Sequence, residues 1–176
     1  MTQRFVVISG LPGSGKTTLG RRLATALGIV LIDKDEILDG LFETKGIGDL
    51  EWRRALSRES DAILEARARD SDGAVLVSHW RIPGMPAESG TPTDWLTSLP
   101  GNLVHVRCAC PAQIAADRFA RRLRHPGHLD SMRAIEEIVA RIYALAALMP
   151  LAIEPVIDVD TSGEPDVEEV LRRLRL

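Results

Sequence analysis

Residues 10–17 read GLPGSGKT, and this segment constrains the fold of the chain more than any other feature. It matches the pattern GxxxxGK[ST], whose glycines let the backbone turn tightly so that several N–H groups point into one concavity. An apolar run at 5–8 leads into it, and a run with helical periodicity at 16–27 follows it. This strand–loop–helix setting indicates a phosphate-binding P-loop, and the chain is therefore expected to bind a nucleoside triphosphate.

Each position of the P-loop predicts a role. Lys16 is expected to reach the β- and γ-phosphates, Thr17 to bind Mg²⁺ and Thr18 to contact the α-phosphate. The loop backbone that should surround the phosphates belongs to Gly10, Gly13, Ser14 and Gly15. A glycine-rich turn without a ligand is the alternative, and the complete motif with its flanking runs disfavours it.

Length and composition limit the remaining possibilities. The 176 residues, 45% of them hydrophobic, predict one folded domain over 1–176. A net charge of −3 argues against nucleic acid as a partner, and no apolar run approaches the roughly 20 residues of a membrane span. The P-loop follows the N-terminus too closely for a signal peptide, and Cys108 and Cys110 read as free thiols. We expect a cytoplasmic protein, either a monomer or a homodimer.

Apolar strand-like runs alternate with helical runs along the chain. Strands are predicted at 4–9, 29–32, 74–78, 103–108 and 156–159. Helices are predicted at 16–27, 35–42, 49–69, 111–123, 130–148 and 165–176. This order predicts an α/β fold, namely a three-layer α/β/α P-loop NTPase fold around a five-stranded parallel sheet. The proline- and glycine-rich segment 82–101 interrupts the alternation and is expected to be a long loop with a helical turn or two within 93–99.

Two classes of P-loop protein lack their usual motifs here. Guanine-specific GTPases carry Asn-Lys-x-Asp, whereas the single asparagine of this chain, Asn102, is followed by Leu103. Hydrolytic ATPases carry an acidic pair after an apolar strand, whereas the run 75–77 is followed by Ser78, His79 and Trp80. A GTPase and a hydrolytic motor are therefore disfavoured.

Four places give the chain a resemblance to small P-loop kinases: the P-loop, 33–35, 118–130 and 160–163. The layout resembles nucleoside monophosphate kinases, shikimate and gluconate kinases and chloramphenicol phosphotransferase, and most of all the AAA_33 kinase-like proteins. The resemblance implies an ATP- and Mg²⁺-dependent enzyme that transfers the γ-phosphoryl group to a hydroxyl of a small molecule. It also implies a lid at about 123–130 and acceptor-side insertions at about 42–54 and 81–101.

The resemblance implies roles for the residues after the second strand. Asp35 corresponds to the catalytic base, and Asp33 is expected to bind Mg²⁺ through water or to fix Lys34. A helix N-cap is the alternative reading of Asp35. We expect Lys34 to be exposed to solvent.

The arginine-rich segment is expected to neutralise the charge that builds on the transferred phosphoryl group. Arg118 and Arg122 lie four residues apart and should share a helix face. The resemblance to adenylate-kinase-like proteins implies that Arg118 lies over the adenine and that Arg122, a catalytic group, reaches the phosphates. A solvated basic face is the alternative. The resemblance also implies that the loop with Thr161 and Gly163 lines the adenine pocket; a plain strand-to-helix turn is the alternative.

The acceptor pocket is expected to involve Asp33, Asp35, Trp52, His79, Trp80 and Arg81. His79 and Arg81 follow the third predicted strand, at the edge where α/β proteins bind ligands. Core packing is the alternative for the tryptophans. A polynucleotide 5′-hydroxyl kinase and a non-catalytic ATP-binding module are the competing functions.

Overall fold

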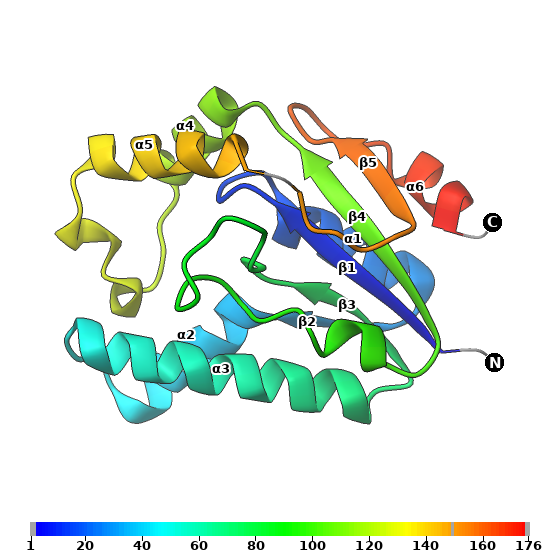
Figure 1. Cartoon of the computed structure of the whole chain (residues 1–176), viewed down its shortest axis with the longest axis horizontal. Helices are drawn as coiled ribbons and strands as arrows, with labels where there is room; N and C mark the ends of the chain where they lie inside the picture. Colours follow the sequence, from blue (N-terminus) through cyan, green and yellow to red (C-terminus); the bar gives the residue numbers. More distant parts are fainter. Residues whose placement is uncertain (1–2, 149, 175–176) are drawn as a thin grey trace.

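The computed structural model describes residues 3–148 and 150–174, and it contains a five-stranded parallel sheet in the order β2-β3-β1-β4-β5 (Figure 1). The strands are β1 (Arg4–Gly10), β2 (Val30–Asp33), β3 (Gly73–Val77), β4 (Asn102–Ala109) and β5 (Val156–Asp160). Every neighbouring pair is parallel, and β1 pairs with both β3 and β4. The predicted parallel sheet and its five strands are confirmed.

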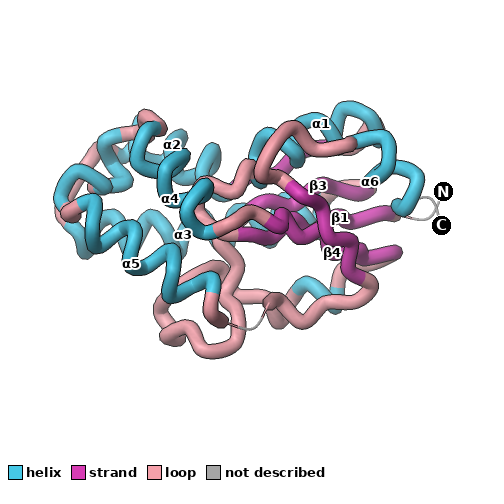
Figure 2. The backbone as a smooth tube through the Cα atoms, turned by 90° about the horizontal axis from the view of Figure 1, so that it is seen from above, coloured by secondary structure: helices cyan, strands magenta, loops and turns pink. Residues whose placement is uncertain are grey.

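The helices cover both faces of the sheet, as the figures show (Figures 1 and 2). They are α1 (Lys16–Leu27), α2 (Lys34–Lys45), α3 (Leu50–Asp70), α4 (Ala112–Arg121), α5 (Ile135–Ala146) and α6 (Val167–Leu174). Alternate residues of β1 enter different cores: Val6 and Ile8 pack with α1 and α6, while Phe5 and Val7 pack with α2, α3 and the long loop. The period of two along a strand thus produces the expected three layers.

Glycines shape the turn between β1 and α1. Gly15 precedes the helix with φ 89°, a left-handed conformation that favours glycine. A Cβ on Gly13 would lie 2.1 Å from the carbonyl oxygen of Ala115 in α4. The P-loop therefore packs closely against α4, and a side chain at 13 would force the two apart.

Several predicted helix boundaries differ from the structure. The predicted helix 130–148 is a 3₁₀ turn over Asp130–Met132 followed by α5 from Ile135, because Arg133 and Ala134 are extended. The predicted helix 111–123 ends at Arg121, since Arg122 is already extended. The last two residues of the predicted helix 165–176 lie outside the described residues.

The long loop after β3 packs on the sheet through Trp95, Leu96 and Leu99, which share a core with Phe5 and Val7. It contains one 3₁₀ turn, Leu96–Ser98, within the stretch where a helical turn is predicted. Trp95 and Leu96 anchor it, being 7% and 0% exposed. Within the described part of the chain, no helix has the length and apolar character needed to cross a membrane.

Candidate active site

The polar residues of the predicted site follow strand ends that meet at one edge of the sheet. The P-loop follows β1, Asp33 closes β2, and His79 lies just beyond β3. Because parallel strands point the same way, their carboxyl ends bring these residues together at the usual ligand-binding edge. The segment that joins α4 to α5 extends down to α2 at the same end of the molecule (Figure 1).

Lys16 lies folded over its own loop. Its ammonium donates to the carbonyl oxygens of Gly10 at 3.0 Å and Leu11 at 2.9 Å. Burial lowers the pKa of Lys16, and the charge of Arg122 also lowers it, whereas Cys108, Asp35 and Asp33 raise it. The lysine therefore lies within electrostatic reach of both predicted site carboxylates.

Thr17 and Asp33 form the part of the site that suits a cation. The Thr17 hydroxyl donates to Asp33 Oδ2 at 2.6 Å, and Asp33 Oδ1 accepts the backbone N–H of Asp35 at 2.9 Å. Asp33 is thus the N-cap of α2, so the alternative reading of Asp35 as the cap is wrong. Burial raises the pKa of Asp33. A hydroxyl and a carboxylate are the hard oxygen donors that Mg²⁺ prefers, so these two residues fit that ion.

Asp35 faces the lid arginines. Its Oδ2 accepts from Arg124 at 2.8 Å and lies 3.6 Å from Arg122 Nη2. Burial alone would raise the pKa of Asp35, but the charges of Arg124, His128, Arg122 and Lys16 outweigh it and hold the pKa below its usual value. The carboxylate is therefore ionised, as a group that must accept a proton requires.

Arg122 does not share a helix face with Arg118, which corrects the prediction. It lies beyond the end of α4, and its guanidinium stands over the ring of Phe119 at 4.9 Å from the centroid. Arg124 bonds Asp130 at 2.9 Å as well as Asp35. The two arginines thus reach the site from the segment 122–134, which joins α4 to α5, contains two 3₁₀ turns and includes the predicted lid at 123–130; we call this whole segment the lid.

The lid is held to α2 by a cluster that sequence reasoning missed. Phe42 stacks on His125 with centroids 5.2 Å apart and meets His128 edge-on at 5.5 Å. The His128 ring pairs with Asp39 at 2.7 Å, and Arg53 donates to the His128 carbonyl at 2.9 Å. Only the His-Pro-Gly-His sequence hinted at this turn; its partners lie more than 70 residues earlier.

Arg118 holds the loop after β5. Its guanidinium donates to the carbonyl oxygens of Thr161 and Ser162, both at 2.6 Å. A Cβ on Gly163 would meet no atom within 4 Å. The structure thus brings Arg118 to the predicted loop, and its role over the adenine stays a prediction.

The predicted acceptor residues separate into different environments. Trp80 is 3% exposed and donates its indole N–H to the Ile8 carbonyl at 2.8 Å, which is the core packing given as the alternative for the tryptophans; its role in the acceptor pocket stays a prediction. The Arg81 guanidinium donates to the carbonyls of Ser89 and Gly90, and these hydrogen bonds connect the start of the long loop to its middle. Trp52 is exposed on the first turn of α3, where its indole donates to the Gly46 carbonyl at 3.1 Å. Among the described residues, none of these three forms a hydrogen bond or ion pair with Asp33 or Asp35.

His79 and Lys34 remain close to the site. Among the described residues, the buried Nε2 atom of His79 has no hydrogen-bond partner. Burial, with the charges of Lys16, Arg141 and Lys34, lowers the pKa of His79 to about 3. Lys34 is 8% exposed and pairs with Asp61 at 2.6 Å, so the expected exposure of Lys34, and its pairing with Asp33, are both wrong.

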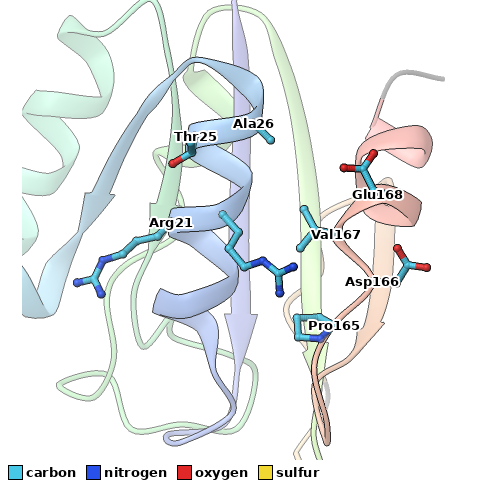
Figure 3. Close-up of a pocket in the computed structure, with 8 residues that line it drawn as sticks. Arg21, Thr25, Ala26, Pro165, Asp166, Val167 and Glu168 are labelled. Carbon is cyan, nitrogen blue, oxygen red and sulfur yellow. The ribbon is translucent and has the colours of Figure 1, made fainter.

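A separate surface groove of about 540 Å³ lies between α1 and α6 (Figure 3). Arg21, Thr25, Pro165 and Glu168 are among its lining residues. It contains no predicted site residue and lies away from the P-loop, so it is not part of this site.

The parallel sheet, the P-loop and the arginine-bearing lid define a small P-loop kinase fold. The AAA_33 family model, described as an AAA domain, matches residues 5–145, and the chain belongs to this family.

Curated relatives match only part of this chain. The shikimate kinase of Corynebacterium jeikeium is 44% identical over 78 residues, which are 43% of this chain and 40% of the relative. That of Mycobacterium tuberculosis H37Ra is 43% identical over 91 residues, which are 46% of this chain and 48% of the relative. The chain thus spans less than half the length of these relatives.

Solved structures share the fold over nearly the whole chain. A provisionally assigned kinase from Chloroflexus aurantiacus has a TM-score of 0.82 at 24% identity, covering 99% of this chain and 98% of the other. A gluconokinase from Sinorhizobium meliloti has a TM-score of 0.56 at 18% identity, covering 97% and 89%.

Proposed function

We propose that this protein is an ATP-dependent phosphotransferase that moves the γ-phosphoryl group to a hydroxyl of a small molecule. One observation carries the proposal: the P-loop lysine and the ionised Asp35 lie within electrostatic reach of each other, with Arg122 and Arg124 beside them. This combines a phosphate-binding loop, a proton acceptor and cations that neutralise a transferred phosphoryl group. The shikimate kinase relatives and the family membership support it.

The proposed reaction is a direct displacement. The acceptor oxygen attacks the γ-phosphorus while the bond to the β–γ bridging oxygen breaks, and ADP leaves with that electron pair. Asp35 accepts the proton of the acceptor hydroxyl. Lys16 and Arg122 bind the phosphoryl oxygens, and Arg124 releases Asp35 when the acceptor enters. Mg²⁺, held by Thr17 and Asp33, would neutralise phosphate charge when bound.

The nucleotide and acceptor occupy opposite sides of Lys16 in this proposal. The backbone of the P-loop surrounds the phosphates, Thr18 contacts the α-phosphate, and Arg118 with the loop at 161–163 borders the base. Asp33, Asp35 and His79 face the acceptor, which is a small polyhydroxylated compound of the kind named in the relatives. The whole domain, 1–176, acts as one unit with its lid.

Phosphorus-31 NMR with MgATP tests the proposal against a panel of shikimate, gluconate and a 5′-hydroxyl oligonucleotide. We expect a new phosphomonoester with a small hydroxylated acceptor. Asp35→Asn should lower kcat by about 10²- to 10⁴-fold, the usual contribution of a general base. Glu36→Gln is the matched control, because Glu36 pairs with Arg21 on the outer surface of the same helix turn.

Calorimetry with MgATP accompanies the NMR measurement. Asp35→Asn should bind MgATP within a few-fold of the wild type, because Lys16 and the loop amides remain in place. Transfer only to the oligonucleotide would replace the small-molecule assignment with an end kinase. Full activity of Asp35→Asn would remove Asp35 as the base.

A further inference from the structure

A buried chain of hydrogen bonds connects α2, α3 and the long loop. Lys34 Nζ lies 2.6 Å from Asp61 Oδ1, and the same oxygen accepts from the Thr91 hydroxyl at 2.7 Å. The Ser78 and Thr91 hydroxyl oxygens are 2.5 Å apart. Because Thr91 donates its single hydroxyl proton to Asp61, the Ser78 hydroxyl donates to Thr91. The four side chains form one continuous path, which we call the Lys34–Ser78 network.

The network joins the two parts of the proposed acceptor side. At one end, Lys34 is the residue between Asp33 and Asp35. At the other end, the Thr91 N–H donates to the His79 carbonyl at 2.8 Å, and the Thr91 carbonyl accepts from the Arg81 N–H at 2.8 Å. The same four-residue path therefore links the Asp33–Asp35 segment to the backbone at His79 and Arg81.

The position of Lys34 is electrostatically unfavourable for a helix. It is the first residue of α2, where the helix dipole favours anions and disfavours cations. Burial lowers the pKa of Lys34, and the charge of Asp61 opposes that change. Buried ion pairs are poor stabilisers compared with apolar residues of the same volume, so a stabilising role alone does not account for this lysine.

We propose that Lys34, Asp61 and Thr91 are positioning residues for phosphoryl transfer. They hold the Asp33–Asp35 segment at a fixed spacing from His79, whose buried Nε2 has no partner among the described residues and is free to bind an acceptor hydroxyl. The inference rests on the proposed function, and it adds how the acceptor is aligned with Asp35.

The experiment compares Lys34→Met and Thr91→Val with Lys45→Met, in the full chain. Lys45 is a matched control because it also joins α2 to α3, through Glu59 at 2.6 Å, but on the exposed surface. Steady-state kinetics give kcat and separate KM values for ATP and the acceptor, and calorimetry gives the affinity for MgATP. Thr91→Val keeps the side-chain shape and replaces the hydroxyl with a methyl group.

We expect Lys34→Met and Thr91→Val each to lower kcat/KM for the acceptor by about tenfold or more, with MgATP affinity within about twofold of the wild type. Lys45→Met should match the wild type. The double variant Lys34→Met/Thr91→Val should lose little more than the stronger single variant, because both break one path. Lys34→Arg should recover part of the acceptor kcat/KM.

Two results would overturn the inference while leaving the proposed function intact. In the first, the wild type is active and Lys34→Met has the same kcat/KM for the acceptor. In the second, the kinetic constants of the variants for both the acceptor and ATP decline in proportion to the fraction of folded protein. If Lys34→Met does not fold, Thr91→Val decides by the same criteria. A wild type that transfers no phosphoryl group removes the proposed function and this inference together.

Discussion

Adding one methyl group at Gly127 should open the lid. A Cβ built there lies 2.4 Å from Cγ of the Phe42 ring, far inside van der Waals contact. The ring is not free to turn away, because Phe42 is 2% exposed and contacts both His125 and His128. Overpacking of this kind costs about 1–3 kcal/mol. If the lid moves away from α2 to relieve this steric clash, the population of molecules with the lid closed on α2 falls by about 5- to 150-fold.

Hydrogen exchange of the lid amides measures this opening. The His128 N–H bonds the His125 carbonyl and the Leu129 N–H bonds that of Pro126, both at 3.0 Å. In Gly127→Ala these amides should exchange faster by the same 5- to 150-fold, while the amides of β1 keep their protection. Gly40→Ala is the control on α2, because a Cβ there meets no atom within 4 Å. Unchanged lid exchange in Gly127→Ala would refute the reasoning that Phe42 holds the lid.

Three further predictions concern pH, the nucleotide loop and the metal. Because the pKa of His79 is lowered to about 3, the unfolded chain binds its proton first as the pH falls. The free energy of unfolding should therefore decrease below about pH 6.5 by up to about 1.4 kcal/mol per pH unit for this group. In urea titrations at several pH values, the free energy of unfolding of His79→Gln should depend less steeply on pH than that of the wild type. Arg118→Met removes two hydrogen bonds to the loop at 161–162. The KM for ATP should therefore rise, and urea titration should show a free energy of unfolding lower by about 1–3 kcal/mol. An unaltered KM for ATP would show that this loop does not contribute to nucleotide binding. Thr17→Val should weaken calorimetric binding of MgATP more than binding of ATP in EDTA, and equal weakening of both would remove Thr17 as a metal ligand.

The features that the sequence predicted correctly depend on short stretches of chain. The P-loop needs its own glycines and flanking runs, and α1 ends at Gly28, a left-handed cap that is visible in the sequence. The buried strands are apolar runs of a few residues, and their alternation with helices specifies the parallel sheet. A short sequence pattern was sufficient to predict a structural feature wherever neighbouring residues in the chain determine that feature.

The errors arose where distant residues decide the outcome. Lys34 is buried because Asp61 on another helix pairs with it. Arg122 leaves α4, and the lid that it begins is held by Phe42 of α2. Neither charge nor periodicity identifies such partners before the chain is folded.

Calorimetric titration of MgATP into the wild type and Lys16→Met tests the central claim most directly, since the proposed chemistry requires the P-loop to bind the triphosphate. Lys16 donates to two loop carbonyls and lies within electrostatic reach of Asp35, so its ammonium is placed to transfer those hydrogen bonds to phosphate oxygens. The account predicts one site in the wild type and an affinity at least about tenfold lower in folded Lys16→Met. Equal affinity in the two proteins, or no binding by folded wild type, would contradict it.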